Sequence, residues 1–222
     1  SFNICIAGTH GKTTITTMTA HLLRHSGYGC NAFLGGIAAN YNSNFWSSEK
    51  NVCVAEADEY DRSFLKLHPD IAVISAMDAD HLDIYGTEDA MQQAFIDFAG
   101  QIKKGGTLFS KWGLKKTTEL KADHHFTYSL QNSNADAYAA NITNREGSYV
   151  FDVHTTGGWL KDVALNMGGL HNIENVVAAI AIAKQLHIED DKIKAAVAAF
   201  KGVKRRFEYI IPPLNNSGTV YV

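Results

Sequence analysis

The sequence contains few cysteines, and they lie far apart. Its 222 residues include three, Cys5, Cys30 and Cys53. An odd and sparse set does not provide the disulfide framework on which small secreted proteins rely. Cys5 and Cys53 lie within short apolar runs, which predicts buried, reduced thiols. We therefore expect a cytoplasmic protein.

Long apolar runs and an excess of basic residues are also absent. No stretch approaches the ~18 consecutive apolar residues of a membrane-spanning helix. The 20 Lys and Arg residues are outnumbered by 23 Asp and Glu residues, for a net charge of -3, so the charge does not indicate a nucleic-acid-binding protein. The chain begins with Ser1 rather than Met, and we expect it to be a piece of a longer protein.

What the sequence does contain is an alternation of short apolar segments with helical patterns. Buried strands are predicted at 3–7, 51–55, 71–76 and 106–110, and helices at 12–25, 88–102, 172–187 and 190–201. Fully apolar strands separated by helices are typical of a parallel sheet covered on both faces. We predict an α/β fold with a P-loop-type, mostly parallel sheet of roughly six strands, flanked by helices.

The segment 126–167 differs in composition from the rest of the chain. It is polar, rich in Asn and Thr, and contains fragments in which apolar and polar residues alternate. Alternation with a period of two, interrupted by a turn at 145–147, is typical of antiparallel strands. We predict that 126–167 forms a small antiparallel β annex within the α/β domain.

The strongest motif follows the first predicted strand and opens the first predicted helix. Glycines allow backbone N–H groups to approach a phosphate, a lysine reaches the outer phosphates, and a hydroxyl group holds Mg²⁺. All three occur here in a compact loop, Gly-x-x-Gly-Lys-Thr. We expect the Lys12 side chain to be solvated on one side and to contribute little to packing. The predicted nucleotide-binding residues of this P-loop are Gly8, Thr9, His10, Gly11, Lys12, Thr13 and Thr14.

Two acidic segments follow the second and third predicted strands. The first, at 56–61, places Glu56 where a P-loop enzyme holds Mg²⁺, with a solvated acidic turn as the alternative. The second surrounds His81 with carboxylates, so His81 is either a metal ligand or a loop histidine bonded to an aspartate. Because ligands collect at the carboxyl ends of parallel strands, we expect both segments beside the P-loop. His21 and His25, which lack a nearby third ligand, are expected to be packing or surface residues.

Two later segments are weaker candidates. A Gly-Gly pair at 168–169 allows backbone to approach a ligand, and His171, Asn172 and Asn175 follow it. The two amides are suited to contact a nucleobase or ribose, and Asn172 is equally suited to cap the helix. Arg206, in the basic segment 204–207, offers a guanidinium group for a phosphate or ribose, with a solvated charge cluster as the alternative.

Together these motifs resemble those of the ATP-dependent Mur ligases of peptidoglycan synthesis. The order is Gly-Thr-His-Gly-Lys-Thr-Thr, Glu-Ala-Asp-Glu, Asp-His, His-Asn-x-x-Asn and Gly-x-x-Arg-Arg-Phe, and it occupies nearly the whole chain. The resemblance implies that Lys12 contacts the ATP phosphates and that Thr13 and Glu56 hold Mg²⁺. His81 would belong to a second metal site. The implied nucleotide pocket is lined by His171, Asn172, Asn175 and Arg206.

The resemblance also implies a domain organisation and a reaction. Residues 1–207 would form the central ATP-binding domain, between an N-terminal UDP-sugar domain and a C-terminal domain. Residues 208–222 would form a hinge and the first strand of the C-terminal domain. The motifs are most similar to those of members that join L-alanine to UDP-N-acetylmuramate through an acyl phosphate made with ATP. The expected catalytic residues are Lys12, Glu56 and His81.

Other functions stay open at this point. Murein-peptide-recycling and folylpolyglutamate-type ligases of the same superfamily are similar in their ATPase motifs. A P-loop phosphotransferase or nucleotide-driven switch, which makes no amide bond, would also use a P-loop with an acidic strand end. A ligase is distinguished from these last two because it forms ADP, phosphate and an amide only when both a carboxylate and an amine are supplied.

Overall fold

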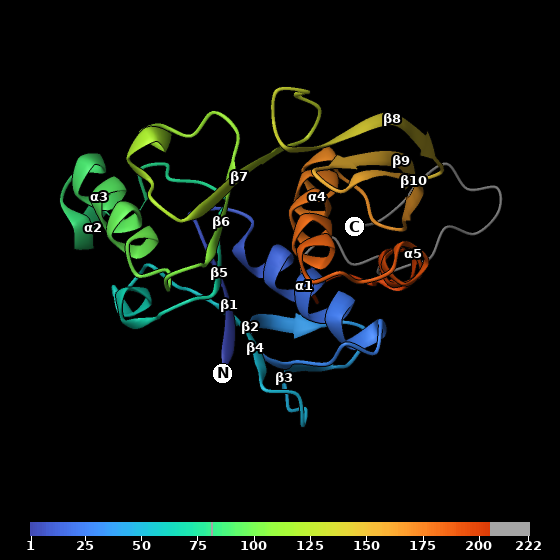
Figure 1. Cartoon of the computed structure of the whole chain (residues 1–222), viewed down its shortest axis with the longest axis horizontal. Helices are drawn as coiled ribbons and strands as arrows, with labels where there is room; N and C mark the ends of the chain where they lie inside the picture. Colours follow the sequence, from blue (N-terminus) through green and yellow to red (C-terminus); the bar gives the residue numbers. More distant parts are fainter. Residues whose placement is uncertain (81, 205–222) are drawn as a thin grey trace.

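The computed structural model describes residues 1–80 and 82–204, and this part of the chain contains one continuous ten-stranded sheet (Figure 1). The strands lie in the order β10-β9-β8-β7-β6-β5-β1-β4-β2-β3. Their bounds are β1 (Phe2–Ala7), β2 (Asn31–Ala38), β3 (Ser43–Trp46), β4 (Val52–Glu56), β5 (Ile71–Ile74), β6 (Thr107–Lys111), β7 (His124–Ser129), β8 (Ala137–Arg145), β9 (Ser148–Thr155) and β10 (Gly158–Leu165). The helices are α1 (Lys12–His25), α2 (Leu82–Tyr85), α3 (Glu88–Ala99), α4 (Leu170–Gln185) and α5 (Asp190–Ala199), with short 3-10 helices η1 (Ser63–Lys66) and η2 (Thr117–Glu119).

The centre of the sheet is parallel, as predicted. β1 pairs in parallel with β4 on one side and with β5 on the other, and the parallel pairing continues to β2 at one end and to β8 at the other. Local signals set the helix starts: the Thr87 side chain accepts a hydrogen bond from the Ala90 N–H at 3.1 Å and so caps α3. The predicted α/β fold class is confirmed.

The antiparallel section is present within the domain as predicted, but it is shorter than 126–167 and is continuous with the main sheet. Residues 126–129 belong to β7, which pairs in parallel with β6. Antiparallel pairing joins β8 to β9 and β9 to β10. Because Tyr128 in β7 pairs with Ala137 in β8, these three strands extend the main sheet. Alternation in the sequence indicates strands with one exposed face, but it does not show to which edge they attach.

A hairpin at the opposite edge of the sheet has no clear signal in the sequence. β2 pairs in parallel with β4 and in antiparallel fashion with β3. Gly35 and Gly36 interrupt the apolar pattern of β2, and glycine inside a strand weakens the strand signal. Phe33 and Phe45 lie exposed on this hairpin, with ring centroids 5.1 Å apart.

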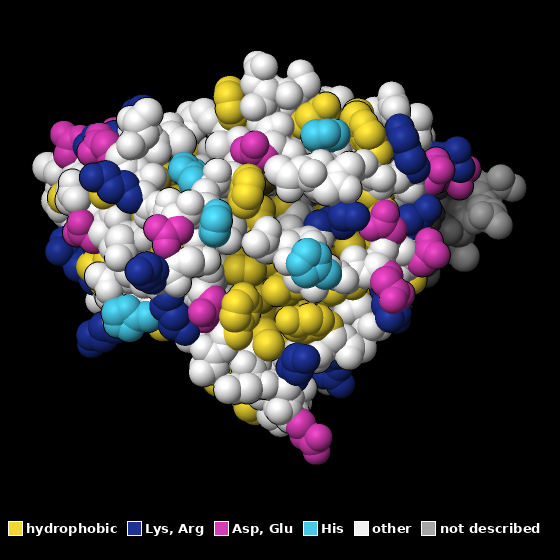
Figure 2. All heavy atoms as spheres, viewed as in Figure 1, with side chains coloured by type: hydrophobic (Ala, Val, Ile, Leu, Met, Phe, Trp, Pro, Cys, Tyr) yellow, Lys and Arg dark blue, Asp and Glu magenta, His cyan; other side chains and the backbone are white. Residues whose placement is uncertain are grey.

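Helices cover both faces of the sheet and create two hydrophobic cores. On one face α1 and α4 pack together, and α4 also contacts β7, β8 and β9. On the other face α3 packs with η1. Figure 1 shows α2 and α3 on one side of the parallel strands, and the antiparallel strands curving around α4. On the face shown in Figure 2, apolar side chains gather near the centre, with charges of both signs around them.

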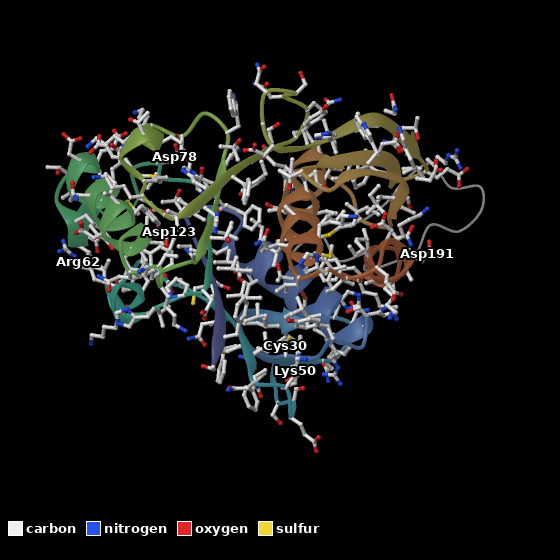
Figure 3. The ribbon with its side chains drawn as sticks, in the orientation of Figure 1. Cys30, Lys50, Arg62, Asp78, Asp123 and Asp191 are labelled. Carbon is white, nitrogen blue, oxygen red and sulfur yellow. The ribbon has the colours of Figure 1, made fainter. Side chains whose placement is uncertain are left out.

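The cysteines lie mostly buried, as their apolar contexts predict. Cys5 and Cys30 are buried, Cys53 is half-buried, and all three are free thiols. Burial raises the pKa of Cys5 and that of Cys30 to about 12, so both are protonated at neutral pH. Cys30 lies below α1 in Figure 3, and its thiol donates to the carbonyl oxygen of Ala20 at 3.6 Å.

Membrane insertion through a helix finds no support in the structure. Across 1–80 and 82–204, none of the helices combines the length and the apolar character that crossing a bilayer requires.

His21 in α1 is a buried histidine that joins three parts of the fold. Its Nε2 lies 2.8 Å from the carbonyl oxygen of Ala196 in α5, and its Nδ1 lies 2.8 Å from the Tyr41 hydroxyl, in the turn between β2 and β3. Because a carbonyl oxygen can only accept, Nε2 carries the proton and Nδ1 accepts from Tyr41. Burial lowers the pKa of His21 to about 4. The expectation that His21 is a packing residue is confirmed.

Because the pKa of His21 is lowered in the folded protein, we predict a loss of stability in mild acid. The folded protein holds His21 neutral, whereas the unfolded chain gains a proton below the ordinary pKa of 6.5. The stabilisation is therefore fully present above pH 6.5 and decreases as the pH falls toward 4. We expect His21 to account for a loss of about 2 kcal/mol in unfolding free energy between about pH 7 and pH 5.

The measurement is urea unfolding at several pH values. His21→Gln should remove most of this pH dependence, whereas the matched variant His25→Gln, which alters an exposed histidine on the same helix, should retain it. An unchanged pH slope in His21→Gln would contradict the assignment.

Candidate functional site

The P-loop connects β1, which ends at Ala7, to α1. Gly8 has a φ of 132°, and a Cβ at this position would lie 2.3 Å from Ser75 Oγ. Ser75 follows β5, and its hydroxyl contacts the carbonyl oxygen of Ala7 at 3.2 Å and that of His10. The loop is therefore held tightly against the end of β5, and glycine is required at position 8.

The first turn of α1 faces an open cavity. Gly11 is the N-cap residue, with a φ of 83°, and no side chain caps the helix or places a carboxylate in its first turn. The backbone N–H groups at this helix start therefore have no local side-chain acceptor, an arrangement that favours anion binding. The cavity has a volume of about 560 Å³ and is lined by Thr9, His10, Gly11, Lys12, Thr13, Gly35, Glu56, Asp58 and Tyr60.

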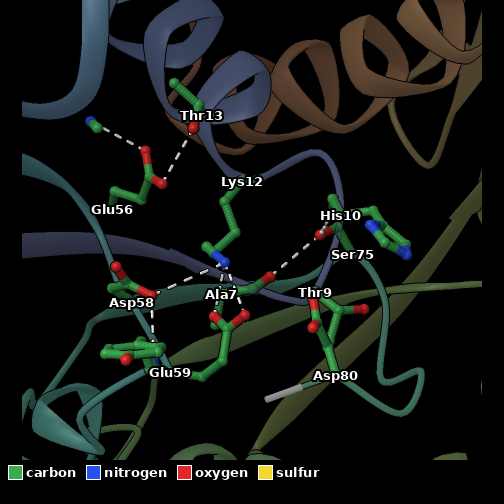
Figure 4. Close-up of polar contacts among 12 residues, drawn as sticks. Ala7, Thr9, His10, Lys12, Thr13, Glu56, Asp58, Glu59, Ser75 and Asp80 are labelled. Atoms are coloured by element: carbon green, nitrogen blue, oxygen red, sulfur yellow. Dashed lines mark hydrogen bonds and ion pairs between the residues drawn. The ribbon is translucent and has the colours of Figure 1, made fainter.

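Thr13 and Glu56 lie together at the edge of this cavity (Figure 4). The Thr13 hydroxyl donates to Glu56 Oε1 at 3.0 Å, and the Gly35 N–H donates to Glu56 Oε2 at 2.9 Å. A Cβ at Gly35 would lie 2.3 Å from that second oxygen, so a larger residue there would displace the Glu56 carboxylate. A hydroxyl and a carboxylate are hard oxygen ligands, and Mg²⁺ in proteins commonly takes one or two such ligands and completes its shell with water and phosphate. These two side chains therefore fit Mg²⁺.

Lys12 is paired with a buried carboxylate. Its Nζ lies 2.7 Å from each side-chain oxygen of Glu59 and 4.0 Å from Asp58 Oδ1. The Glu59 side chain is 0% exposed and that of Lys12 is 13% exposed. The expectation that Lys12 is solvated on one side agrees with its place in the cavity lining. The expectation that it contributes little to packing is wrong, because it pairs with the buried Glu59. Figure 4 shows the Lys12 side chain pointing toward Glu59, below the loop.

The segment after β5 also contacts the P-loop. The Asp78 N–H donates to the Thr9 hydroxyl at 3.3 Å. His10 Nε2 lies 3.8 Å from an oxygen of Asp78, and both side chains are largely exposed. Among the residues of 1–80 and 82–204, no group of three or more His, Cys, Asp or Glu side chains is arranged to hold a metal ion.

The start of α4 packs against the P-loop. Asn175 Oδ1 lies 2.9 Å from the position that a Cβ of Gly11 would occupy. Asn172 is buried, and its side-chain amide donates to the carbonyl oxygen of Gly168 at 2.6 Å, which is a local structural role. His171 lies beside Asn172 and is exposed. Of the two predicted amides, Asn175 is thus the one that reaches the P-loop.

Some predicted features lie outside the described residues, and other residues of the site were not predicted. His81, Arg206 and the segment 208–222 are in the first group. The second group comprises Ser75 and the pairing of Glu59 with Lys12. Ser75 has a signal that could have found it, because it is the first polar residue after the apolar strand 71–74. Glu59 has none, because its acidic neighbours suggest a solvated turn.

A mostly parallel sheet with a phosphate-binding loop after β1 and a carboxylate at the end of the neighbouring strand β4 defines a P-loop nucleotide-binding domain. The family model described as "Mur ligase middle domain" matches residues 6–183. The chain therefore belongs to the Mur ligase family. This membership confirms the family predicted from the motifs and supports ATP as the bound nucleotide.

Several curated relatives are UDP-N-acetylmuramate–L-alanine ligases. The one from Flavobacterium johnsoniae is 46% identical over 211 residues, which covers 95% of this chain and 45% of the relative. The one from Porphyromonas gingivalis is 45% identical over 210 residues, which covers 94% of this chain and 46% of the relative. The chain thus spans about half the length of the curated relatives that it matches.

Solved structures of similar fold include two ligases that act on UDP-N-acetylmuramate, according to their descriptions. The UDP-N-acetylmuramate-alanine ligase of Thermotoga maritima matches with a TM-score of 0.80 and 26% identity, over 95% of this chain and 47% of that one. The UDP-N-acetylmuramate:L-alanyl-gamma-D-glutamyl-meso-diaminopimelate ligase of Neisseria meningitides matches with a TM-score of 0.79 and 26% identity, over 92% of this chain and 67% of that one. The fold alone does not separate these two kinds.

The Lys12–Glu59 pair predicts that Lys12→Ala affects folding as well as phosphate binding. Removing the ammonium group leaves a buried carboxylate without its main counter-charge, which costs about 3 kcal/mol of unfolding free energy. Lys12→Ala with Glu59→Gln should recover at least about 1 kcal/mol of that loss, because the buried group is then neutral.

Urea unfolding of the two variants gives both values. The matched control is Lys115→Ala, which breaks a 2.7 Å ion pair with Glu88 on the protein surface and should cost much less. Equal losses of unfolding free energy for Lys12→Ala and Lys115→Ala would show that the burial of Glu59 does not increase the cost of breaking its ion pair.

Proposed function

We propose that this chain is the nucleotide-binding part of an ATP-dependent ligase that joins L-alanine to UDP-N-acetylmuramate in peptidoglycan precursor synthesis. The observation that supports this most directly is the contact of Thr13 with Glu56 beside the P-loop, in a chain 46% identical to a relative of that name. The reaction belongs to the cytoplasm, in keeping with the buried, free thiols.

The residues of the cavity have separate tasks in holding the nucleotide. The N–H groups of the first turn of α1 and the ammonium group of Lys12 bind the triphosphate. Thr13 and Glu56 supply oxygen ligands for Mg²⁺, which when bound offsets the charge of the phosphates. His171 and Asn175, at the start of α4, would contact the nucleoside. His81 and Arg206 lie outside the described residues, and only the family resemblance assigns them to a second metal site and to the nucleoside.

The reaction needs this arrangement because a carboxylate does not react with an amine at neutral pH. A carboxylate oxygen of UDP-N-acetylmuramate attacks the γ-phosphorus of ATP, the bond to the bridging oxygen breaks, and ADP leaves. The amine of L-alanine then attacks the acyl carbon, phosphate leaves, and an amide forms. The chain's own contribution is to hold two anions close together, for which Lys12 and the helix start supply positive charge.

Contacts with the UDP-sugar and with alanine come from domains on either side of this one. The curated relatives are about twice as long as the chain, which leaves room for an N-terminal and a C-terminal domain. The murein-peptide type of ligase is the nearest alternative, given TM-scores of 0.80 and 0.79 for the two kinds. Sequence favours the alanine type, because relatives at 41–46% identity carry that name.

The first test concerns Glu56. In Glu56→Gln the amide oxygen can still accept from the Gly35 N–H, and the amide nitrogen can donate to the Thr13 hydroxyl, so the local hydrogen bonds survive while the charge is lost. We expect ATP affinity measured by calorimetry with Mg²⁺ to fall by about tenfold, and affinity without Mg²⁺ to change by less than about twofold.

The matched control for Glu56→Gln is Asp61→Asn, which neutralises an exposed carboxylate in the same acidic segment. It should leave both affinities unchanged. Equal losses with and without Mg²⁺ in Glu56→Gln would mean that Glu56 has a structural role and no part in metal binding.

The second test concerns the reaction itself. The chain is joined to the flanking domains of the Flavobacterium johnsoniae relative and supplied with ATP, Mg²⁺, UDP-N-acetylmuramate and L-alanine. We expect ADP, phosphate and the amide in equal amounts, and no amide from the chain alone, because positioning of the two substrates accounts for ~7–11 kcal/mol of such a barrier. ATP hydrolysis without any amide would contradict a ligase.

A further inference from the structure

Lys12 and Glu59 form an ion pair inside the phosphate-binding site that the proposed reaction does not use. Both side-chain oxygens of Glu59 lie 2.7 Å from Lys12 Nζ, and Glu59 is fully buried. Lys12 also lines the cavity that faces the start of α1, whereas Glu59 does not. The ammonium group that should contact phosphates is therefore held by a carboxylate behind the cavity wall.

Glu59 is fixed in place by the backbone around it. Its carbonyl oxygen accepts a hydrogen bond from the Tyr85 hydroxyl at 2.5 Å and another from the Arg62 N–H at 3.0 Å. Two residues earlier, the Ala57 N–H donates to the carbonyl oxygen of Ile6 in β1 at 2.8 Å. Tyr85 is itself buried in the core beneath α3. The main chain at Glu59 is therefore anchored, and its buried side chain does not line the cavity.

Lys12, in contrast, can change position. Its ammonium group lies at the end of a flexible four-carbon stem and carries three N–H donors. A triphosphate in the cavity offers several negatively charged oxygens to the same group. The exchange of one partner for the other thus requires a rotation of the lysine side chain, with no rearrangement of the sheet.

We propose that Glu59 is a positioning residue that holds the Lys12 ammonium group away from the phosphate-binding cavity in the nucleotide-free protein. Binding of a nucleoside triphosphate then draws the ammonium group from Glu59 to the phosphates. This inference rests on the proposed function, because it takes Lys12 as the phosphate-binding lysine. Glu59 then competes with the nucleotide, and the affinity for ATP is lower than the cavity alone would give.

The competition predicts a gain of affinity when the pair is weakened. In Glu59→Gln the buried group keeps its shape and loses its charge, so the ammonium group is released more easily. We expect the Kd for Mg-ATP, measured by calorimetry on the 222-residue chain, to fall by about tenfold. Adenosine, which has no phosphate for Lys12 to bind, should bind with an affinity unchanged to within about twofold.

Two further variants distinguish the effect of the Lys12–Glu59 ion pair on Mg-ATP affinity from a general effect of negative charge near the site. Glu59→Asp keeps the charge and withdraws the carboxylate by one methylene group, so it should also tighten Mg-ATP binding, and it serves in place of Glu59→Gln if that variant does not fold. Asp58→Asn removes a charge of the same sign that is 4.0 Å from Lys12 Nζ and 61% exposed, and it should have a smaller effect because solvent screens it.

A double variant shows whether Glu59 acts through Lys12. In a Lys12→Ala background, Glu59→Gln should change the Kd for Mg-ATP no more than Asp58→Asn does. A merely structural role of Glu59 predicts instead the same effect in both backgrounds, and for adenosine as well as for ATP.

The outcomes distinguish this inference from the proposed function. In one outcome the unaltered chain binds Mg-ATP, and the Glu59→Gln and Glu59→Asp variants bind it equally well or more weakly. The proposed exchange is then wrong and Glu59 instead holds Lys12 ready for the phosphates, while the proposed function stands. If the unaltered chain shows no binding of Mg-ATP at millimolar concentration, the proposed function is contradicted, and the exchange with it.

Discussion

The parallel register of β1 with its two neighbours determines where the site forms. Ile6 in β1 pairs with Glu56 in β4, and Ala7 pairs with Ile74 in β5. The three strands therefore end at the same level, which brings together the P-loop, Glu56 and Ser75 from distant parts of the sequence. This pairing relies on strands that are apolar on both sides, because helices cover both faces of the sheet. The geometry of the site thus depends on the same burial that stabilises the domain.

Close approach of these strand ends restricts which side chains the site can hold. Gly8, Gly11 and Gly35 each leave less than 3 Å between a hypothetical Cβ and a neighbouring polar atom, so no larger residue fits without displacement. Near these glycines, Glu59 is fully buried, whereas Lys12 is 13% exposed and lines the cavity. Breaking this pair costs more than breaking a surface pair, because the buried carboxylate loses a counter-charge.

The sequence predicts the parts of the fold and site that depend on local spacing. The P-loop, the central strands and the helices follow from neighbouring residues, and Glu56 follows from its place at a strand end. The β2–β3 hairpin is missed because Gly35 and Gly36 break its alternation, and the attachment of β8 to β7 is a long-range pairing that no local pattern encodes. The burial of Glu59 depends on Lys12 and Tyr85, which are 47 and 26 residues away along the chain. Tertiary contacts alone therefore distinguish it from its solvated acidic neighbours.

A lysine shared between a buried carboxylate and a nucleotide connects folding to turnover. In the empty site, Glu59 gives the ammonium group a partner, so the domain does not need bound nucleotide to avoid an unpaired buried charge. In the occupied site, the phosphates must offset the loss of that partner, which weakens binding of substrate and product alike. Under the proposed function, release of ADP would gain from this, because tight binding of the ground state does not by itself increase kcat. Glu59 then acts as the acceptor to which Lys12 returns when the phosphates leave, and the stability of the empty domain and the release of product depend on the same pair of atoms.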